Sequence, residues 1–180
     1  MTKRPAGPPA AHRERPPREH DPDTLAPWTF EPIGVVRSPW RYVHDAPRQS
    51  GIDETAQAQI VLRRGMQNCL ADLAGFDRVW ILFVFSYARG WKEKVRPPRD
   101  TKKRGVLSTR SPHRPNPLGL SCVRLLGVRG RTLRIAGHDL LDGTPVLDLK
   151  PYLPYCDAHP GVRAGYTEGL AEGNSDHRWA

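Results

Sequence analysis

The sequence predicts a mainly β domain that folds as a closed or nearly closed barrel with one or two short helices. Seven short stretches rich in β-branched and aromatic residues are separated by turn signals, which is typical of barrels and sandwiches. Repeating strand–helix units, which would indicate a parallel α/β sheet, do not occur in the sequence. The length of 180 residues suits one domain of ordinary size.

The expected strands follow one another along the chain. Phe30–Arg37 ends before a Ser-Pro step, and Gln57–Leu62 alternates polar and apolar residues, as a half-buried strand does. Val79–Phe85 is apolar throughout, so we expect it to be a central strand buried on both faces. The remaining expected strands are Gly105–Thr109, Ser121–Val128, Thr132–Ile135 and Val146–Lys150.

Turn and helix signals complete the expected architecture. Arg129-Gly130-Arg131 separates two expected strands and is typical of a hairpin turn. One helix is expected at Met66–Leu73, where Gly75 would stop it.

Composition divides the chain into three parts. Residues 1–27 hold seven prolines and a net charge near +1, so we expect a disordered tail that buries too little surface to offset its ordering entropy. Residues 28–156 are expected to form the folded domain. Residues 157–180 carry a net charge of −2 and four glycines, which favours a loose C-terminal extension.

The positive charge is concentrated in one stretch. The 28 Lys and Arg residues exceed the 19 Asp and Glu residues by nine, which favours a polyanionic partner. Residues 89–114, called the basic loop below, hold ten basic residues against Glu93 and Asp100. An aromatic residue, Trp91, lies among these cations, as is common where a loop follows a nucleic-acid backbone and stacks on bases. The alternative is a solvated loop without a partner.

Several classes of protein are disfavoured by the sequence. The longest purely apolar run is Val79–Phe85, far shorter than the roughly 20 residues of a membrane-spanning helix. No secretory signal is expected at the N-terminus. Three widely spaced cysteines indicate neither a disulfide framework nor a metal site, and they fit the cytoplasm. Neither the glycine-rich dinucleotide motif nor the P-loop motif is present.

The stretch Ser108–Ser121 (STRSPHRPNPLGLS) is the most informative motif. Its three prolines fix three φ angles within six residues, so Arg110 and Arg114 project from a stiff, extended support. Guanidinium groups on a stiff support suit bidentate binding of carboxylates and phosphates. The alternative is a proline-braced loop with a purely structural role.

Two further stretches carry polar groups suited to ligand binding. In PRQSG, Arg48 can pair with an anion and Gln49 can read an amide or a base edge. In HDLLDGTPVLDLKP, Asp139 and Asp142 flank a turn whose N–H groups are expected to point outward. These carboxylates can accept from an amine, orient ribose hydroxyls or abstract a proton. The alternative is an Asx-type turn in which Asp142 binds its own backbone.

Six motifs in residues 30–156 resemble those of the TrmO family of tRNA methyltransferases, also called TsaA-like or YaeB-like. They are IGVVRSP, PRQSG, FDRVWILFVF, VRPPR, GVLSTRSPHRPNPLGLS and DLLDGTPVLDLKPYLPY. The resemblance implies a single TsaA-like β-barrel domain that binds S-adenosyl-L-methionine, without a metal, and forms a homodimer. It also implies methylation of the base nitrogen of threonylcarbamoyladenosine beside the anticodon, with the tRNA anticodon arm on the basic loop.

The resemblance also implies which residues bind the ligands. The positions for S-adenosyl-L-methionine are Arg48, Gln49, Ser50, Ser86, Tyr87, Arg110, Leu120, Asp142, Gly143, Thr144, Pro145 and Val146. The residues expected to bind the tRNA are Arg89, Lys92, Arg96, Arg99, Arg114, Asn116 and Lys150. One of Arg89, Arg114 and Lys150 would hold the threonine carboxylate of the modified base.

The reaction needs a proton acceptor, because the acceptor nitrogen carries a proton that must leave. The candidates are Asp139, Asp142 and Tyr87, and the sequence leaves all three open. Relatives often carry His-Gln where this chain has Ser86-Tyr87, and Tyr87 is expected to stack on the adenine ring. Longer relatives carry a further C-terminal domain, whereas 24 residues follow Cys156 here.

Two other functions fit the same residues. One is a methyltransferase that acts on a small molecule, whose substrate affinity would not depend on salt as binding to tRNA does. The other is a module that binds S-adenosyl-L-methionine or RNA without catalysis.

Overall fold

The computed structural model describes residues 21–170 of the chain. The chain divides into two compact units, Met1–Phe30 and Glu31–Ala180. In the first unit the described part contains one 3-10 turn, η2 (Pro22–Thr24), and all of its side chains are exposed. The second unit contains the strands and every residue discussed below.

The expected tail and C-terminal extension lie partly outside the described residues. Residues 1–20 belong to the expected disordered tail, and residues 171–180 belong to the expected extension. The predicted boundaries after residues 27 and 156 therefore remain predictions.

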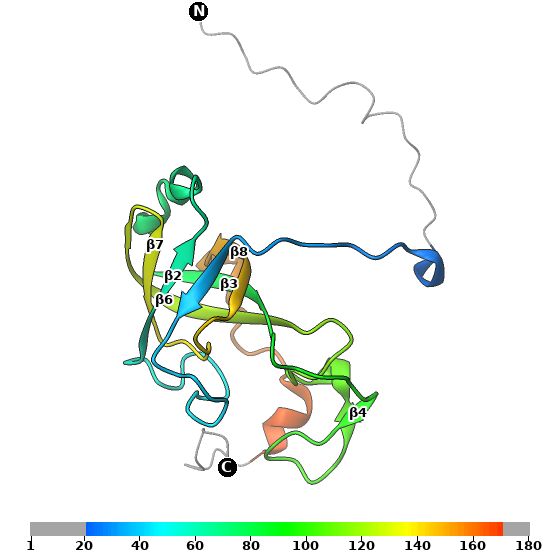
Figure 1. The fold of residues 1–180 in the computed structure, drawn as a ribbon. Helices are drawn as coiled ribbons and strands as arrows, with labels where there is room; N and C mark the ends of the chain where they lie inside the picture. Colours follow the sequence, from blue (N-terminus) through cyan, green and yellow to red (C-terminus); the bar gives the residue numbers. More distant parts are fainter. Residues whose placement is uncertain (1–20, 171–180) are drawn as a thin grey trace, which may run out of the picture. The chain divides into compact units, whose positions relative to one another are not determined.

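Six strands of the second unit form a closed barrel in the order β1-β2-β7-β6-β3-β8 (Figure 1). All neighbouring strands in it are antiparallel. Closure pairs the strand edges with each other. The prediction of a mainly β barrel is confirmed. The barrel strands are β1 (Gly34–Arg37), β2 (Gln57–Leu62), β3 (Arg78–Val84), β6 (Leu118–Arg129), β7 (Thr132–Ala136) and β8 (Pro145–Pro151).

The core fills the barrel with aliphatic side chains. Every second residue of β2 is buried, as its alternating sequence predicts. In β3, which is apolar at every position but the first, burial still alternates between full and partial. The expectation that this strand is buried on both faces is therefore wrong for its outer face, because a barrel strand has only one inner face. Central core residues are Val36, Ile60, Ile81, Val123, Leu133, Ile135 and Val146.

The expected strand Gly105–Thr109 is a turn instead. Only the two-residue strand β5 (Arg104–Gly105) is extended, and the 3-10 turn η5 (Val106–Ser108) follows it. The hydroxyls of Ser108 and Thr109 each donate to the main-chain carbonyl three residues earlier, at 2.7 and 2.8 Å. These local hydrogen bonds stabilise the turn and compete with strand pairing.

The segment Met66–Leu73, where one helix was expected, does not form a continuous helix. Two 3-10 turns, η3 (Gln67–Leu70) and η4 (Leu73–Gly75), replace it. Between them Asp72 adopts a left-handed conformation with φ of 64°, which ends the helical run. The single α-helical turn among residues 21–170 is α1 (Pro154–Asp157), which the sequence pattern did not predict.

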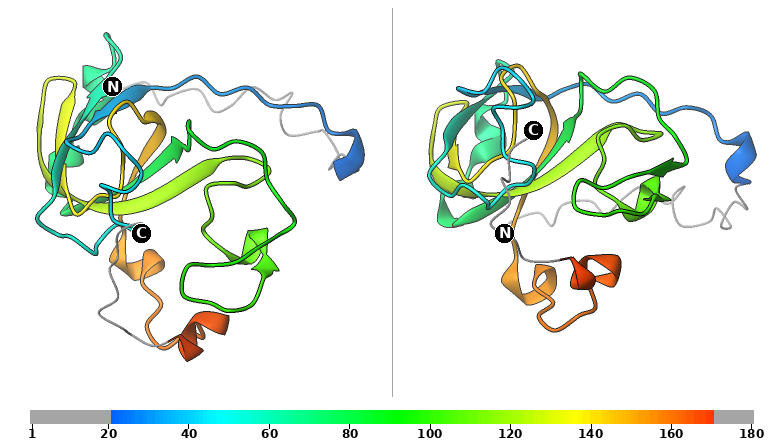
Figure 2. Two further views of the ribbon diagram at one scale, coloured as in Figure 1. Left: turned by 60° about the horizontal axis from the view of Figure 1, so that its bottom comes forward. Right: turned by 90° about the horizontal axis from the view of Figure 1, so that it is seen from below.

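The chain between β3 and β6 extends away from the barrel, as the green segment in Figures 1 and 2 shows. It contains the basic loop and a small sheet of β4 (Lys94–Val95) and β5. A C-terminal 3-10 turn, η6 (Gly165–Gly169), contacts this segment, because the Tyr166 ring lies 4.7 Å from the Arg104 guanidinium. No helix in the described part of the chain is long and apolar enough to span a membrane.

Candidate cofactor and catalytic site

The PRQSG loop and the proline-rich stretch meet through one side-chain hydrogen bond. Gln49 Oε1 accepts from Arg110 Nη1 at 2.7 Å, although 61 residues separate them. Gln49 Nε2 in turn donates to the Arg48 carbonyl at 2.6 Å, which fixes the orientation of the amide. The exposed guanidinium of Arg110 is thus held in place while its other N–H groups remain available to a ligand.

Asp139 lies where these loops meet the barrel. Its Oδ1 accepts a hydrogen bond of 2.6 Å from Ser121 Oγ, and Ser121 is only 2% exposed on the inner face of β6. Burial raises the pKa of the Asp139 carboxyl above its ordinary value, while hydrogen bonds from Ser121 and the Ser50 backbone and the charge of Arg110 oppose this rise. Asp139 therefore links the PRQSG loop, the proline-rich stretch and β6 through one carboxylate.

Asp142 has a different environment from Asp139. Its Oδ1 accepts from the backbone N–H of Ser38 at 3.1 Å, so it ties the last turn to the end of β1. The backbone N–H groups of Asp142 and Gly143 donate to the carbonyls of Trp40 and Val36, at 2.8 and 3.0 Å. The expectation that the N–H groups of this turn point outward is therefore wrong for these two. The Asx-type alternative is also wrong, because the partner is Ser38 rather than its own segment.

The rest of the DGTP turn leads into the core. Thr144 is buried, and its carbonyl accepts from the Val36 N–H at 3.0 Å. Pro145 opens β8 and pairs with Val35, and Val146 is fully buried in the barrel. These residues hold the turn against β1, and among residues 142–146 Gly143 is the exposed one.

His138 supports the segment that carries Asp139. It is fully buried, its ring centroid lies 4.3 Å from that of Trp40, and Nδ1 accepts from the Leu140 N–H at 3.2 Å. Burial lowers its pKa to about 4, so the ring is neutral at pH 7. His138 is a structural residue of the site.

Ser86 and Tyr87 lie at the end of β3 and are connected to the proline-rich stretch. The Ser86 carbonyl accepts from Arg89 Nη1 at 3.0 Å. His113 Nδ1 lies 3.3 Å from the Arg89 backbone nitrogen and 3.1 Å from its carbonyl oxygen. Tyr87 is 62% exposed, so its ring is accessible to a ligand.

Leu120 lies on the outer face of β6, next to a close contact between two strands. It is 58% exposed, whereas its neighbour Ser121 points inward to Asp139. Gly119 pairs with Phe83, and a Cβ at Gly119 would lie 2.2 Å from the Phe83 ring. The absence of a side chain at Gly119 thus allows the Phe83 ring to pack directly on β6. The structure places Leu120 and Asp139 on opposite faces of β6.

Two of the arginines expected to bind tRNA are held by the loops of the site. Arg89 donates to the carbonyls of Ser86 and Ala88, and Arg114 Nη1 donates to the Thr109 carbonyl at 3.3 Å. Arg89 is thus joined to the proline-rich stretch through His113, and Arg114 lies close to the chain at Thr109, beside Arg110.

The other expected tRNA-binding residues are separate from this group. Lys150 lies on β8 opposite Trp80 and forms an ion pair with Asp148 at 2.7 Å, so the structure does not bring it to these loops. Three residues of the basic loop and one of the proline-rich stretch are exposed: Lys92, Arg96, Arg99 and Asn116.

Sequence reasoning missed Ser121 as a residue of the site. A signal was present, because Ser121 is the polar member of an otherwise small or apolar inward series on β6. No group of three His, Cys, Asp or Glu residues that could hold a metal ion occurs within residues 21–170.

Fold and site together define a closed β-barrel protein with a cluster of polar groups at the loops around Asp139. The sequence profile described as the tRNA-methyltransferase O N-terminal domain matches residues 35–158. This chain belongs to that family.

Individual relatives agree with this assignment. The tRNA (adenine(37)-N6)-methyltransferase of Escherichia coli K12 is 38% identical over 154 residues, covering 80% of this chain and 66% of the relative. A probable S-adenosyl-L-methionine-binding protein of Pyrococcus abyssi is 37% identical, covering 77% of this chain and 76% of the relative. A crystal structure of TrmO from Pseudomonas aeruginosa is 37% identical with a TM-score of 0.67, covering 78% of this chain and 63% of that chain. The chain thus spans just under two thirds of the length of the Escherichia coli relative and of this solved TrmO.

Proposed function

We propose that the protein transfers a methyl group from S-adenosyl-L-methionine to the base nitrogen of threonylcarbamoyladenosine, next to the anticodon of tRNA. The observation that carries the proposal is the meeting of three motif segments at the partly buried Asp139 carboxylate. Family membership supports the reaction class, and relatives carry names that specify S-adenosyl-L-methionine and adenine 37 of tRNA. The basic loop, with a charge of +8, supports a polyanionic substrate.

The residues present fit S-adenosyl-L-methionine. Arg110, held by Gln49, suits the carboxylate of its amino-acid part, since a positioned guanidinium binds carboxylates in a bidentate manner. The exposed Tyr87 offers apolar surface for the adenine ring, whereas Leu120, on the opposite face of β6 from Asp139, is left out of this arrangement. When bound, S-adenosyl-L-methionine supplies the methyl group and the leaving sulfur.

We assign the role of general base to Asp139. The reaction requires a group that accepts the proton of the acceptor nitrogen, and a general base contributes typically 10²–10⁴-fold. The raised pKa of Asp139 moves its basicity toward neutral pH, as this role requires. Asp142 is occupied by the Ser38 N–H and holds the turn, and Tyr87 is exposed. Ser121 orients Asp139 through its 2.6 Å hydrogen bond.

The basic loop and the arginines beside it bind the RNA in this proposal. Arg89 and Arg114 lie on the connected loops and hold the threonine carboxylate of the modified base. Lys92, Arg96 and Arg99 neutralise phosphates of the anticodon arm, as exposed cations do. Alignment of the acceptor nitrogen with the methyl carbon then supplies much of the rate enhancement.

The deciding experiment combines the protein with S-adenosyl-L-methionine and tRNA that carries threonylcarbamoyladenosine without the methyl group. Digestion to nucleosides and mass spectrometry then follow that nucleoside. Its conversion to a singly methylated species is the expected result. Cofactor binding without conversion would contradict the tRNA substrate and favour a small-molecule acceptor. Failure to bind S-adenosyl-L-methionine would contradict the enzyme assignment.

We further propose that the protein acts as a homodimer in the cytoplasm. The motif resemblance given above supports the first point, and the widely spaced cysteines support the second. Light scattering coupled to size-exclusion chromatography should give twice the mass of 20.3 kDa. A mass of one chain at the concentration of the methylation assay would contradict the dimer.

A further inference from the structure

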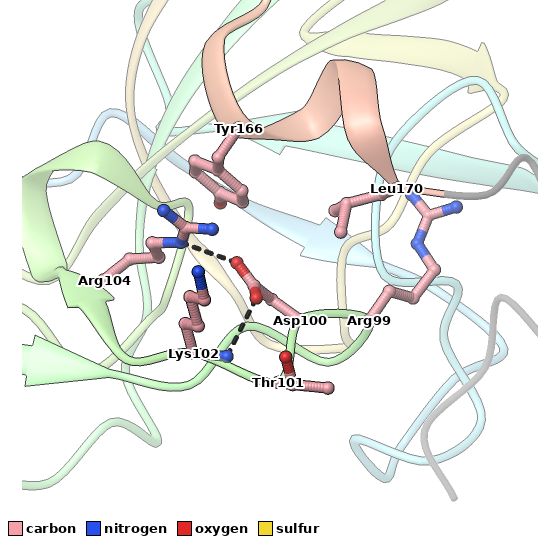
Figure 3. A pocket seen from close by; sticks show the side chains of 7 residues that line it. All are labelled: Arg99, Asp100, Thr101, Lys102, Arg104, Tyr166 and Leu170. Atoms are coloured by element: carbon pink, nitrogen blue, oxygen red, sulfur yellow. Dashed lines mark hydrogen bonds and ion pairs between the residues drawn. The ribbon is translucent and has the colours of Figure 1, made fainter.

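A shallow pocket lies between the basic loop and the C-terminal segment that holds η6 and Leu170, and no residue of PRQSG or of Ser108–Ser121 lines it. Its volume is about 370 Å³ (Figure 3). The basic loop contributes Arg99, Lys102 and Arg104 together with Asp100, and the C-terminal segment contributes Tyr166 and Leu170. As Figure 3 shows, Tyr166 and Leu170 face the loop residues across the pocket. Residues far apart in sequence therefore build one site.

The charges of this pocket do not cancel. Asp100 is paired with Arg104, whose Nε lies 2.6 Å from Oδ2, and its Oδ1 accepts from the Lys102 backbone N–H at 2.9 Å. The side-chain hydrogen bond from Arg104 lowers the pKa of Asp100, so the pair stays ionised. No ion pair with another residue of the described chain involves Arg99 or Lys102. One carboxylate thus faces three cations.

Tyr166 packs against one of the three cations of the pocket. Its ring centroid lies 4.7 Å from the Arg104 guanidinium, which Asp100 fixes by its ion pair. A guanidinium over an aromatic face is an attractive contact that orders both groups. The pocket therefore combines a positioned aromatic ring with two uncompensated cations, which is the combination that binds single-stranded nucleic acid by stacking and charge.

We propose that this pocket binds one backbone phosphate of the tRNA together with an unpaired base beside it. Arg99 and Lys102 contact the phosphate, and Tyr166 stacks on the base. The inference rests on the proposed function, and it extends that function to the C-terminal segment, which becomes part of the RNA-binding surface. Arg104 and Asp100 act as positioning residues for the Tyr166 ring.

Substitution of two neighbouring lysines distinguishes binding of a phosphate in this pocket from a general attraction between the positive charge of the loop and the RNA. Lys102 lines the pocket, whereas Lys103 is exposed beside it and does not. Binding of the full-length protein to labelled tRNA is measured by fluorescence anisotropy over a series of salt concentrations. Lys102→Ala should lower the slope of log affinity against log salt by roughly 0.7, the value for one phosphate on a single strand. Lys103→Ala should lower it less. Equal effects of the two substitutions would overturn the pocket.

Substitution of tyrosines tests the stacking contact. Tyr166→Ala should weaken tRNA binding at least about fivefold, because stacking of one base on an aromatic ring corresponds to at least that factor. Tyr166→Phe keeps the ring and should retain the affinity, which a role of the tyrosine hydroxyl would not allow. Tyr155→Ala, at a tyrosine that is 85% exposed on α1, serves as the matched control. Unchanged affinity of Tyr166→Ala would overturn the stacking assignment.

The same variants distinguish a failure of this inference from a failure of the proposed function. Isothermal titration of S-adenosyl-L-methionine should give the same affinity for Lys102→Ala and Tyr166→Ala as for the wild type, which also shows that they fold. If the wild type methylates tRNA and all pocket variants bind tRNA equally well, only the pocket is wrong. If the wild type binds S-adenosyl-L-methionine but not tRNA, the proposed substrate and the pocket are both wrong.

Discussion

The barrel end around Asp139 and the basic loop are built in different ways. At the barrel end the polar groups are buried or partly buried, and their hydrogen bonds join distant segments, such as Ser121 to Asp139 and Gln49 to Arg110. In the basic loop most side chains are exposed. Between residues 91 and 108 of this loop, the side-chain hydrogen bonds are short in range, such as Asp100 to Arg104 and Ser108 to the Gly105 carbonyl.

This difference matches the two tasks of the proposed function. Methyl transfer requires groups held within a fraction of an ångström, and long-range contacts to a closed barrel provide that rigidity. Attraction of a polyanion requires only exposed charge, which short local turns can carry. Substitutions at the barrel end should therefore act on rate and stability, whereas substitutions in the basic loop should act on RNA affinity.

The largest effect is expected for Asp139. Asp139→Asn keeps an oxygen that can accept from Ser121 but removes the base, so the single-turnover rate of methyl transfer should fall by about 10²–10⁴-fold. Rapid-quench measurement at saturating S-adenosyl-L-methionine and tRNA gives this rate. Asp148→Asn provides the control, because Asp148 is paired with Lys150 on the side of the barrel and should leave the rate unchanged.

Asp142→Asn tests the choice between the two carboxylates. An asparagine at this position can still accept from the Ser38 N–H, so the rate should fall much less than in Asp139→Asn. If Asp142→Asn lowers the rate more than Asp139→Asn does, the assignment of the base is wrong. If both variants keep the wild-type rate, neither carboxylate is the base.

The sequence predicts the barrel better than it predicts the loops. The strand Gln57–Leu62 has the predicted bounds, because its alternation directly reflects one buried face. The predictions of a strand at Gly105–Thr109 and of a helix at Met66–Leu73 were wrong. Local hydroxyl hydrogen bonds decide the conformation of the first segment, and the left-handed Asp72 decides that of the second. Such contacts depend on individual side chains rather than on periodicity.

The sequence predicts which motifs belong to the candidate site, but it does not predict the hydrogen bonds between them. The proline-rich stretch and PRQSG were recognisable as ligand-binding loops, yet nothing in their spacing shows that Arg110 bonds Gln49. The different environments of Asp139 and Asp142 depend on which strand each one meets after closure of the barrel. The contact of Tyr166 with Arg104 joins segments 62 residues apart, so no local pattern predicts it.

The next effect concerns the buried His138. Its pKa falls from 6.5 in the unfolded chain to about 4 in the fold, so the unfolded state binds the proton more readily. The stabilising contribution is complete above pH 6.5 and is lost as the pH falls toward 4, in total about 3 kcal/mol. His138→Asn should remove this part of the pH dependence of urea unfolding. His159→Asn, at an exposed histidine, should retain it, and an unaltered pH dependence in His138→Asn would contradict the assignment.

Two glycines test the difference in packing between the regions. Gly119→Ala places a Cβ 2.2 Å from the buried Phe83 ring and should lower the free energy of unfolding by about 1–3 kcal/mol. Gly105→Ala in the basic loop meets only the Ser108 hydroxyl at 3.8 Å, with an ordinary φ of −56°, and should change it by less than about 0.5 kcal/mol. Urea unfolding of both variants gives the comparison. Equal losses would show that the basic loop is packed as tightly as the barrel.

The smallest effect is expected from two serine hydroxyls. Ser121 Oγ donates to Asp139, and this hydrogen bond lowers the pKa of the carboxyl against the effect of burial. Ser121→Ala should therefore raise that pKa further, because it removes a hydrogen bond that favours the ionised carboxylate. Because Asp139 must be ionised to accept a proton, the acid limb of the pH–rate profile should move to higher pH. Ser108→Ala, which removes a hydroxyl bonded to the Gly105 carbonyl in the basic loop, should leave that limb in place. A shift in both variants, or in neither, would show that Ser121 does not act through Asp139.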